Sequence, residues 1–171
     1  MKARKSTVYF STVLFFILMH FVVRPASAQT QEVRLEDLTK KADVIARGNV
    51  TNVQSEWSSD KTRIFTKVTL AVDEYVKGEK PERTLVITHL GGEVNGVGEL
   101  YTHTPRFAKG EEVLVFGKKD RKNNLIVTGG DAGKVLVTKD KLTGEKMVQG
   151  GLTLKMFTST LKSIVEQQKI K

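Results

Sequence analysis

Cysteine is absent from the 171-residue chain, and proline occurs only three times. Without cysteine there is no disulfide framework, no thiolate metal site, no iron–sulfur cluster and no cysteine nucleophile. The absence also excludes attachment as a bacterial lipoprotein, because that class needs a lipidated cysteine. Stability then does not rely on an oxidising compartment, which favours a bacterial source for a secreted chain.

The longest hydrophobic run lies close to the beginning of the chain. Residues 8–23 are mostly apolar; three basic residues precede them, and the small-x-small sequence 26–28 follows. This order predicts a signal peptide over residues 1–28, cleaved after Ala28. The run of about 16 residues is shorter than the roughly 20 of a spanning helix. We therefore expect a secreted protein, periplasmic or extracellular, with no stable membrane anchor after cleavage.

Positive charge exceeds negative charge, with 28 Lys and Arg against 19 Asp and Glu and a net charge of +9. Four of the basic residues belong to the predicted leader, so 24 against 19 remain after cleavage, a net charge of +5. These residues are dispersed among acids, and secretion separates the chain from most nucleic acid, so we expect no nucleic-acid partner. The densest basic run, 118–122, is interpreted as a solvated hairpin tip, with contact to an anionic envelope polymer as the alternative.

The hydrophobic pattern of the remaining chain changes from period four to period two and back. Apolar residues at three- and four-residue spacing predict a short helix over 31–43 and a longer one over 153–168, which Thr153 caps. Between them, alternating and continuous apolar runs predict strands separated by glycine, proline and polar turns. The expected strands cover residues 44–54, 63–77, 84–90, 113–116, 125–127 and 134–138, with a further short strand at 146–149.

Two segments between these strands are expected to be irregular. Residues 55–61 are polar apart from Trp57 and predict a turn or loop. Residues 91–98 contain four glycines, so we expect no regular element of much stability there. By contrast, the continuous apolar run 113–116 indicates a strand that is buried on both faces. The long strand over 63–77 is expected to bend or to carry a bulge.

Together these elements predict a mainly β fold of five to six strands. We expect a small antiparallel OB-like β-barrel with a short N-terminal helix and a C-terminal helix packed on it, and a small sandwich is the alternative. No repeat, low-complexity tract or linker divides the chain. Residues 29–171 are therefore expected to form one secreted domain.

Four segments carry a resemblance to known proteins. Residues 42–53 read A-D-V-I-x-x-G-x-V-x-x-V, and residues 72–78, 107–116 and 133–135 complete the set. The set resembles a group of uncharacterised secreted bacterial proteins and, more distantly, netrin-type modules, the OB-fold domain of the tissue inhibitors of metalloproteinases. The resemblance implies a barrel fold, because the matched glycines and valines have structural roles.

One departure from those inhibitors concerns their mechanism. Their processed N-terminal cysteine binds the zinc of the target through its α-amine and carbonyl, and disulfides hold that end rigid. Here Gln29 is the expected first residue, and the chain has no cysteine. The inhibitory mechanism therefore does not transfer. The resemblance implies a secreted module of unknown partner, and an inhibitor that lacks the cysteine mechanism remains an alternative.

The candidate metal ligands are His89 and His103, with Glu93 and Glu99 nearby. Two histidines and a carboxylate would suit zinc. Their spacing fits no compact ligand motif, so we interpret both histidines as hydrogen-bonded or solvated and expect no cofactor. A metal-dependent enzyme remains the less favoured alternative.

The glycine-rich segment is a candidate for partner binding. No Lys-Ser/Thr pair and no helix follow it, which argues against a phosphate-binding loop. Long loops often carry function, so we expect Gly91, Gly92, Glu93 and His103 to contact a partner.

Three aromatic residues, Trp57, Phe65 and Tyr75, lie on or near the polar parity of the first hairpin. They could form an exposed stacking surface, but packing under the terminal helices is favoured. Phe65 and Tyr75 are our candidates for the contact surface on the outer face.

Catalysis has little support in the sequence. The chain contains no Gly-x-Ser-x-Gly motif, and the paired carboxylates Asp73-Glu74 and Glu111-Glu112 are adjacent, so on a strand they face opposite sides. We therefore predict no enzyme. The expected role is noncatalytic binding of a protein or an envelope polymer.

Overall fold

The computed structural model describes residues 34–78 and 82–170. The predicted leader 1–28, its cleavage after Ala28 and the start of the predicted N-terminal helix lie outside the described residues. In chain order the elements are α2 (Leu35–Lys41), β1 (Val44–Trp57), β2 (Ile64–Lys77), β3 (Thr84–Leu90), β4 (Gly92–Val94), β5 (Val97–Glu99), β6 (Glu112–Lys119), β7 (Leu125–Val127), the 3₁₀ helix η1 (Gly130–Gly133), β8 (Lys134–Lys139), β9 (Lys146–Val148) and α3 (Leu154–Lys169).

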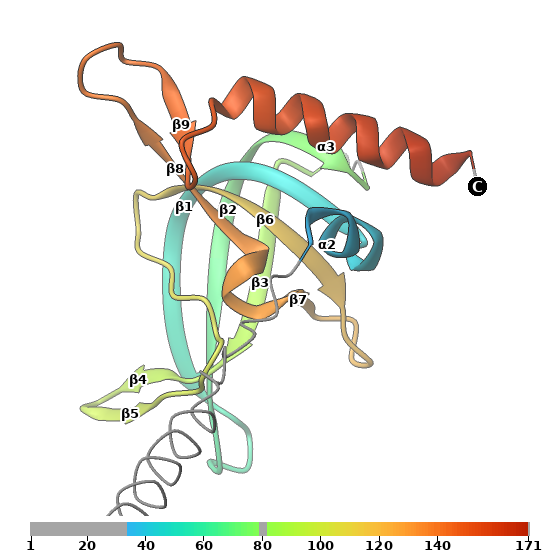
Figure 1. Cartoon of the computed structure of the whole chain (residues 1–171). Coiled ribbons are helices and arrows are strands. Elements are labelled where there is room, and N and C mark those ends of the chain that lie inside the picture. The colour runs from blue at the N-terminus through green and yellow to red at the C-terminus, as the bar shows by residue number, and fades with distance from the viewer. Residues whose placement is uncertain (1–33, 79–81, 171) are drawn as a thin grey trace, which may run out of the picture. The chain divides into compact units, whose positions relative to one another are not determined.

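Five strands close into a ring. β1 pairs antiparallel with both β2 and β6, β2 pairs with β3, and β6 pairs with β7. The ring closes where β3 and β7 run parallel at Ile87 and Leu125. β8 and β9 extend the sheet beyond β6 (Figure 1). The predicted OB-like β-barrel with one helix at each end of the chain is confirmed.

Strand β6 separates two apolar clusters. Val113 and Val115 point into the barrel, whereas Leu114 and Phe116 point outward to the helices, and all four side chains are fully buried. The expectation of a strand buried on both faces is confirmed, because alternate side chains of one strand fill two different cores. The barrel cluster comprises Val44, Ala46, Val50, Val68, Leu70, Val72, Leu85, Ile87, Val113, Val115 and Leu125.

Bulges shift the register of β1 against β2, as the length of the second strand predicted. Tyr75 pairs with Ala46 and packs against the barrel cluster, whereas Val76 faces the helices. The expectation that Tyr75 packs under the terminal helices is thereby corrected. The bulge reverses which side chains of β2 point inward, so Tyr75 faces the barrel and Val76 faces the helices.

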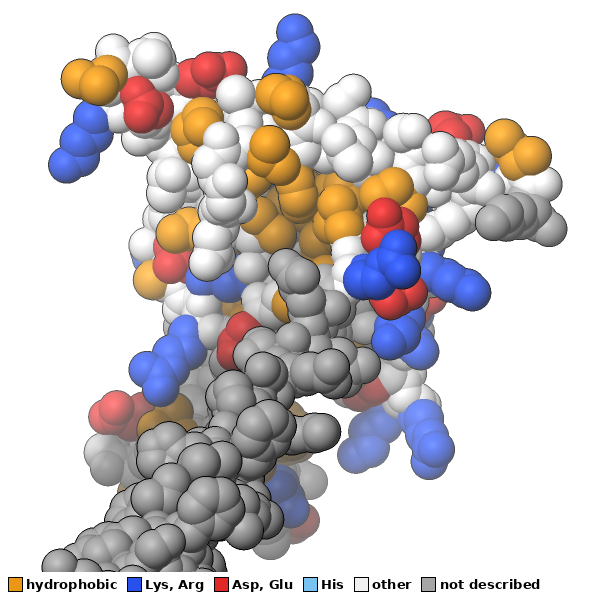
Figure 2. All heavy atoms as spheres, viewed as in Figure 1, with side chains coloured by type: hydrophobic (Ala, Val, Ile, Leu, Met, Phe, Trp, Pro, Cys, Tyr) orange, Lys and Arg blue, Asp and Glu red, His pale blue; other side chains and the backbone are white. Residues whose placement is uncertain are grey.

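Helix α3 begins as the sequence predicts. The Thr153 hydroxyl accepts a hydrogen bond from the Met156 amide at 3.2 Å, which caps the first turn. Leu161 and Val165 then pack with Leu38 of α2 and Phe116 of β6. Figure 2 shows hydrophobic side chains gathered between the two helices, with Lys and Arg scattered around them.

The first hairpin is longer than predicted. Strand β1 continues through Trp57, so the loop expected at 55–61 begins only at Ser58. The Ser58 hydroxyl and the Asp60 carboxylate accept hydrogen bonds from the Thr62 amide, and together they close the turn. Hydrogen bonds from Ser58 and Thr62 lower the pKa of Asp60 to about 2. The pairing of β1 with β2 therefore continues past the residues in which apolar and polar side chains alternate.

The glycine-rich segment forms the β4–β5 hairpin, which corrects the expectation of an irregular loop. Asn95 and Gly96 both have positive φ, 52° and 79°, as the two central residues of a type I′ turn require. Val94 and Val97 flank this turn and pair with each other. An Asn-Gly pair between two valines is a hairpin signal, and it outweighs the loss of regularity expected from glycine content.

Candidate functional site

The candidate site is a cavity of about 650 Å³ at one mouth of the barrel, at the base of the β4–β5 hairpin. We call it the mouth site. Strands β1, β2 and β3 supply one wall, and the hairpin and the segment after it supply the other. Its lining residues are Val53, Ser55, Thr66, His89, Leu90, Gly91, Gly92, Glu93, Gly98, Glu99, Leu100, Tyr101, Thr104, Arg106 and Phe107.

Hydroxyl groups hold the start of the hairpin against the barrel. Thr66 Oγ1 donates to the Gly91 carbonyl at 2.6 Å and lies 2.9 Å from Ser55 Oγ. A Cβ at Gly92 would overlap both hydroxyl oxygens, and Gly92 has a φ of +133°. The close approach and the backbone conformation both require glycine here.

A carboxylate holds the end of the hairpin. Glu99 Oε2 accepts hydrogen bonds from the Ile64 amide and the Tyr101 hydroxyl, each at 3.1 Å. Arg63 donates to the same tyrosine hydroxyl at 3.0 Å. The hairpin is therefore fixed at both ends to the start of β2, so the mouth site has a defined wall.

Aromatic contacts form the floor of the mouth site. The ring of His89 stacks on Phe107 with centroids 6.3 Å apart, and Lys134 Nζ lies 4.8 Å from the Phe107 centroid. Lys134 also pairs with Glu111 at 2.6 Å. Phe107 packs against the barrel cluster and so covers this end of the core.

Apolar side chains are exposed at the rim. Leu100 is 79% exposed, Val97 is 50% exposed and Leu90 is 37% exposed. Leu90 and Leu100 line the mouth site, and Val97 lies on the projecting hairpin. Exposed apolar groups around a cavity are typical of surfaces that bind a partner.

The structure does not gather the candidate metal ligands into one set. His89 lines the mouth site with Glu93 and Glu99, but His103 lines a neighbouring cavity of about 520 Å³. Glu99 already accepts two hydrogen bonds, and His89 Nδ1 bonds the Leu90 carbonyl at 2.9 Å. Over residues 34–78 and 82–170, no three His, Asp or Glu side chains lie close enough to hold a metal ion.

The hydroxyl of Thr66 in the mouth site does not contact the neighbouring histidine through a described hydrogen bond. Thr66 and His89 are cross-strand partners, but Thr66 donates to Gly91 rather than to the imidazole. A serine or threonine nucleophile needs a base in hydrogen-bond contact.

The candidate contact residues Phe65 and Tyr75 do not form one surface. Phe65 is half-buried and pairs across the strands with Leu90, which places it beside the mouth site. Tyr75 lies ten residues along β2, about 30 Å away at a strand rise of 3.3 Å per residue, and donates to the Glu82 carbonyl. Burial raises the pKa of Tyr75. Phe65 is therefore compatible with a contact at the mouth, but Tyr75 is not.

Sequence reasoning missed a second polar region, near α3. Arg47 Nη1 donates to Glu112 at 2.6 Å and to Asp73 at 3.2 Å, and Arg47 Nε lies 3.6 Å from Glu74. Lys162 of α3 pairs with Glu74, and Lys146 of β9 pairs with Glu112. These six residues are called the Arg47 cluster. The six residues are spread from position 47 to position 162, so no local sequence pattern connects them.

The Arg47 cluster changes the acidity of Glu112. Burial opposes ionisation of its carboxylate, but hydrogen bonds from Lys146 and Arg47 outweigh burial and lower the pKa. The side chain is only 15% exposed. Glu112 is therefore held ionised beneath β9.

Neither protein-family models nor curated protein sequences match the chain. The assignment of fold therefore rests on the strand order, and the resemblance to netrin-type modules remains a prediction. No helix within the described residues has the length and apolar character needed to cross a membrane.

Proposed function

We propose that the chain is a secreted, noncatalytic binding module that contacts a protein or an envelope polymer through the mouth site. The observation that carries the proposal is the exposed apolar rim around a defined cavity. Barrel mouths are common binding sites because loops and strand ends converge there. The fixed hairpin reduces the entropy lost on binding, since its position is already set.

The composition of the rim favours a protein partner over a polymer. Leu90, Val97 and Leu100 offer apolar contacts, and Arg106 adds a donor group beside them. The buried centres of protein interfaces are more apolar than the rest of the surface and are enriched in arginine.

The test is capture of a partner from the native secreted fraction by the tagged chain. We expect Leu100→Asp to reduce recovery at least about tenfold, because a charge would enter an apolar contact. Leu142→Asp is the matched control, since Leu142 is 96% exposed and lies on the turn between β8 and β9. Equal recovery by both variants would contradict the mouth site as the contact surface. Sedimentation with isolated envelope polymer tests the second partner class.

A further inference from the structure

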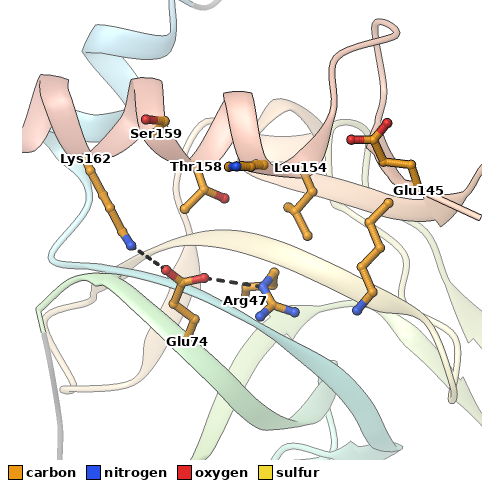
Figure 3. Close-up of a pocket in the computed structure, with 9 residues that line it drawn as sticks. Arg47, Glu74, Glu145, Leu154, Thr158, Ser159 and Lys162 are labelled. Carbon is orange, nitrogen blue, oxygen red and sulfur yellow. Dashed lines mark ion pairs between the residues drawn. The ribbon is translucent and has the colours of Figure 1, made fainter.

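A separate cavity of about 430 Å³ lies beneath the first turns of α3, above β1 and β2 and beside β9 (Figure 3). We call it the α3 cavity. It shares no residue with the mouth site. Its lining residues are Arg47, Glu74, Glu145, Lys146, Leu154, Lys155, Thr158, Ser159 and Lys162.

Two buried polar atoms beside this cavity have no hydrogen-bond partner. They are Thr158 Oγ1 and Arg47 Nε, the two such side-chain atoms found in the described part of the chain. Thr158 is 8% exposed, and Figure 3 shows its hydroxyl pointing down from α3 toward the strand that carries Arg47. A buried donor without a partner is unfavourable, so an acceptor atom between them would be stabilised.

The charged groups around the cavity include one cation without an ion-pair partner. Four of the nine lining residues are cations and two are acids, and Asp73 and Glu112, which bond Arg47 and Lys146 from outside the lining, balance the remaining charge. Glu74 is engaged by Lys162 at 2.7 Å, whereas Lys155 has no ion-pair partner among the described residues. The N-terminal end of α3 adds partial positive charge.

The other acids of the Arg47 cluster do not line the α3 cavity. Asp73 and Glu112 bond Nη1 of Arg47 and hold the guanidinium in place. Arg47 Nε, which has no hydrogen-bond partner, lies 3.6 Å from Glu74 Oε2, a distance too long for a hydrogen bond. Glu145 is an exposed acid at the side of the cavity.

We propose that the α3 cavity binds a phosphate group. Phosphate carries about −1.5 to −2 charges at neutral pH and presents several acceptor oxygens, which suit Lys155 and the two unpartnered donors. The two unpartnered atoms are closed to solvent, so lining side chains must move aside as a phosphate oxygen reaches them. Free phosphate and a phosphate ester share this chemistry.

The test is a titration of the ¹⁵N-labelled chain with inorganic phosphate at constant ionic strength, followed by amide chemical shifts. We expect saturable shifts in the first turns of α3 and in β9. A parallel titration with glycerol phosphate identifies the source: saturation there shows that an ester fits, and its absence restricts the site to free phosphate. Shifts that grow linearly without saturation, or that occur at the mouth site, would overturn the proposal.

Matched variants assign the binding to named groups. We expect Thr158→Val and Lys155→Gln each to weaken phosphate binding about tenfold, since charge-assisted hydrogen bonds are lost. Thr160→Val and Lys169→Gln make the same changes at exposed positions of α3 outside the cavity and should leave binding unchanged. Thr158→Val should remain folded, because the hydroxyl that it removes has no partner. Undiminished binding by this folded variant would contradict the assignment.

Discussion

The mouth site and the α3 side lie toward opposite ends of the barrel (Figure 1) and are held in different ways. At the mouth, hydrogen bonds to backbone groups fix a hairpin that glycine allows to approach closely. At the α3 side, an apolar cluster and the Arg47 cluster hold a helix. The difference teaches that backbone geometry determines the mouth, whereas side-chain volume and charge determine the position of α3.

The largest effect is expected from a substitution that removes apolar volume from the α3 side. Leu161 is fully buried, so Leu161→Ala should lower the free energy of unfolding by about 2–5 kcal/mol, through lost burial and a cavity. Leu142→Ala, at a 96% exposed leucine, should change it by less than about 0.5 kcal/mol. Urea unfolding of both variants measures the difference. Similar values for the two would show that α3 contributes little to the folded state.

A smaller effect on the free energy of unfolding is expected when a methyl group is added at the mouth. Gly92→Ala adds backbone strain at positive φ and an overlap with Ser55 and Thr66. Gly150→Ala is the control, because Gly150 has a φ of +97° with no atom near its Cβ position. We expect about 1 kcal/mol for the control and at least about 1 kcal/mol more for Gly92→Ala, measured by urea unfolding. Equal losses would mean that the close approach does not hold the hairpin.

The smallest expected effect concerns the α3 side and depends on pH. The pKa of Glu112 is lowered from its ordinary value of 4.5, so its contribution is present above that pH and is lost as the pH falls through the lowered pKa. Glu112→Gln should cost about 1 kcal/mol at pH 7 and less in acid, so its unfolding free energy should vary less with pH than that of the wild type. A parallel pH profile in both chains would exclude Glu112 as the source.

Local patterns were sufficient for most elements of the fold. Thr153 and the spacing of Leu161 and Val165 predicted α3, and the apolar run 113–116 predicted a strand buried on both faces. The β4–β5 hairpin is also encoded locally, because the turn pair Asn95-Gly96 outweighs the glycine content of the segment. The length of the second strand predicts a bend or a bulge, but the position of the bulge, and with it the reversal at Tyr75 and Val76, depends on pairing with β1.

The residues of the candidate sites were likewise only partly predictable from the sequence. Residues 91–93 were identified from composition, and they do line the mouth site. His103 was expected beside them, but it lines the neighbouring cavity instead. Arg47, Thr158 and Lys155 were not identified, because each has an ordinary role when only its sequence neighbours are considered. Their proximity depends on α3 crossing the barrel.

The sequence by itself determined the absence of every cysteine-based mechanism, the order of strands and helices, and the capped start of α3. These follow from residue chemistry and from periods of two and four residues, which act over short stretches of chain. Only the tertiary structure decided which strands close the ring, which side of β2 faces inward after its bulge, and which charges surround Arg47. Those features depend on contacts between residues far apart in the chain, such as Arg47 with Glu112, and no local pattern specifies them.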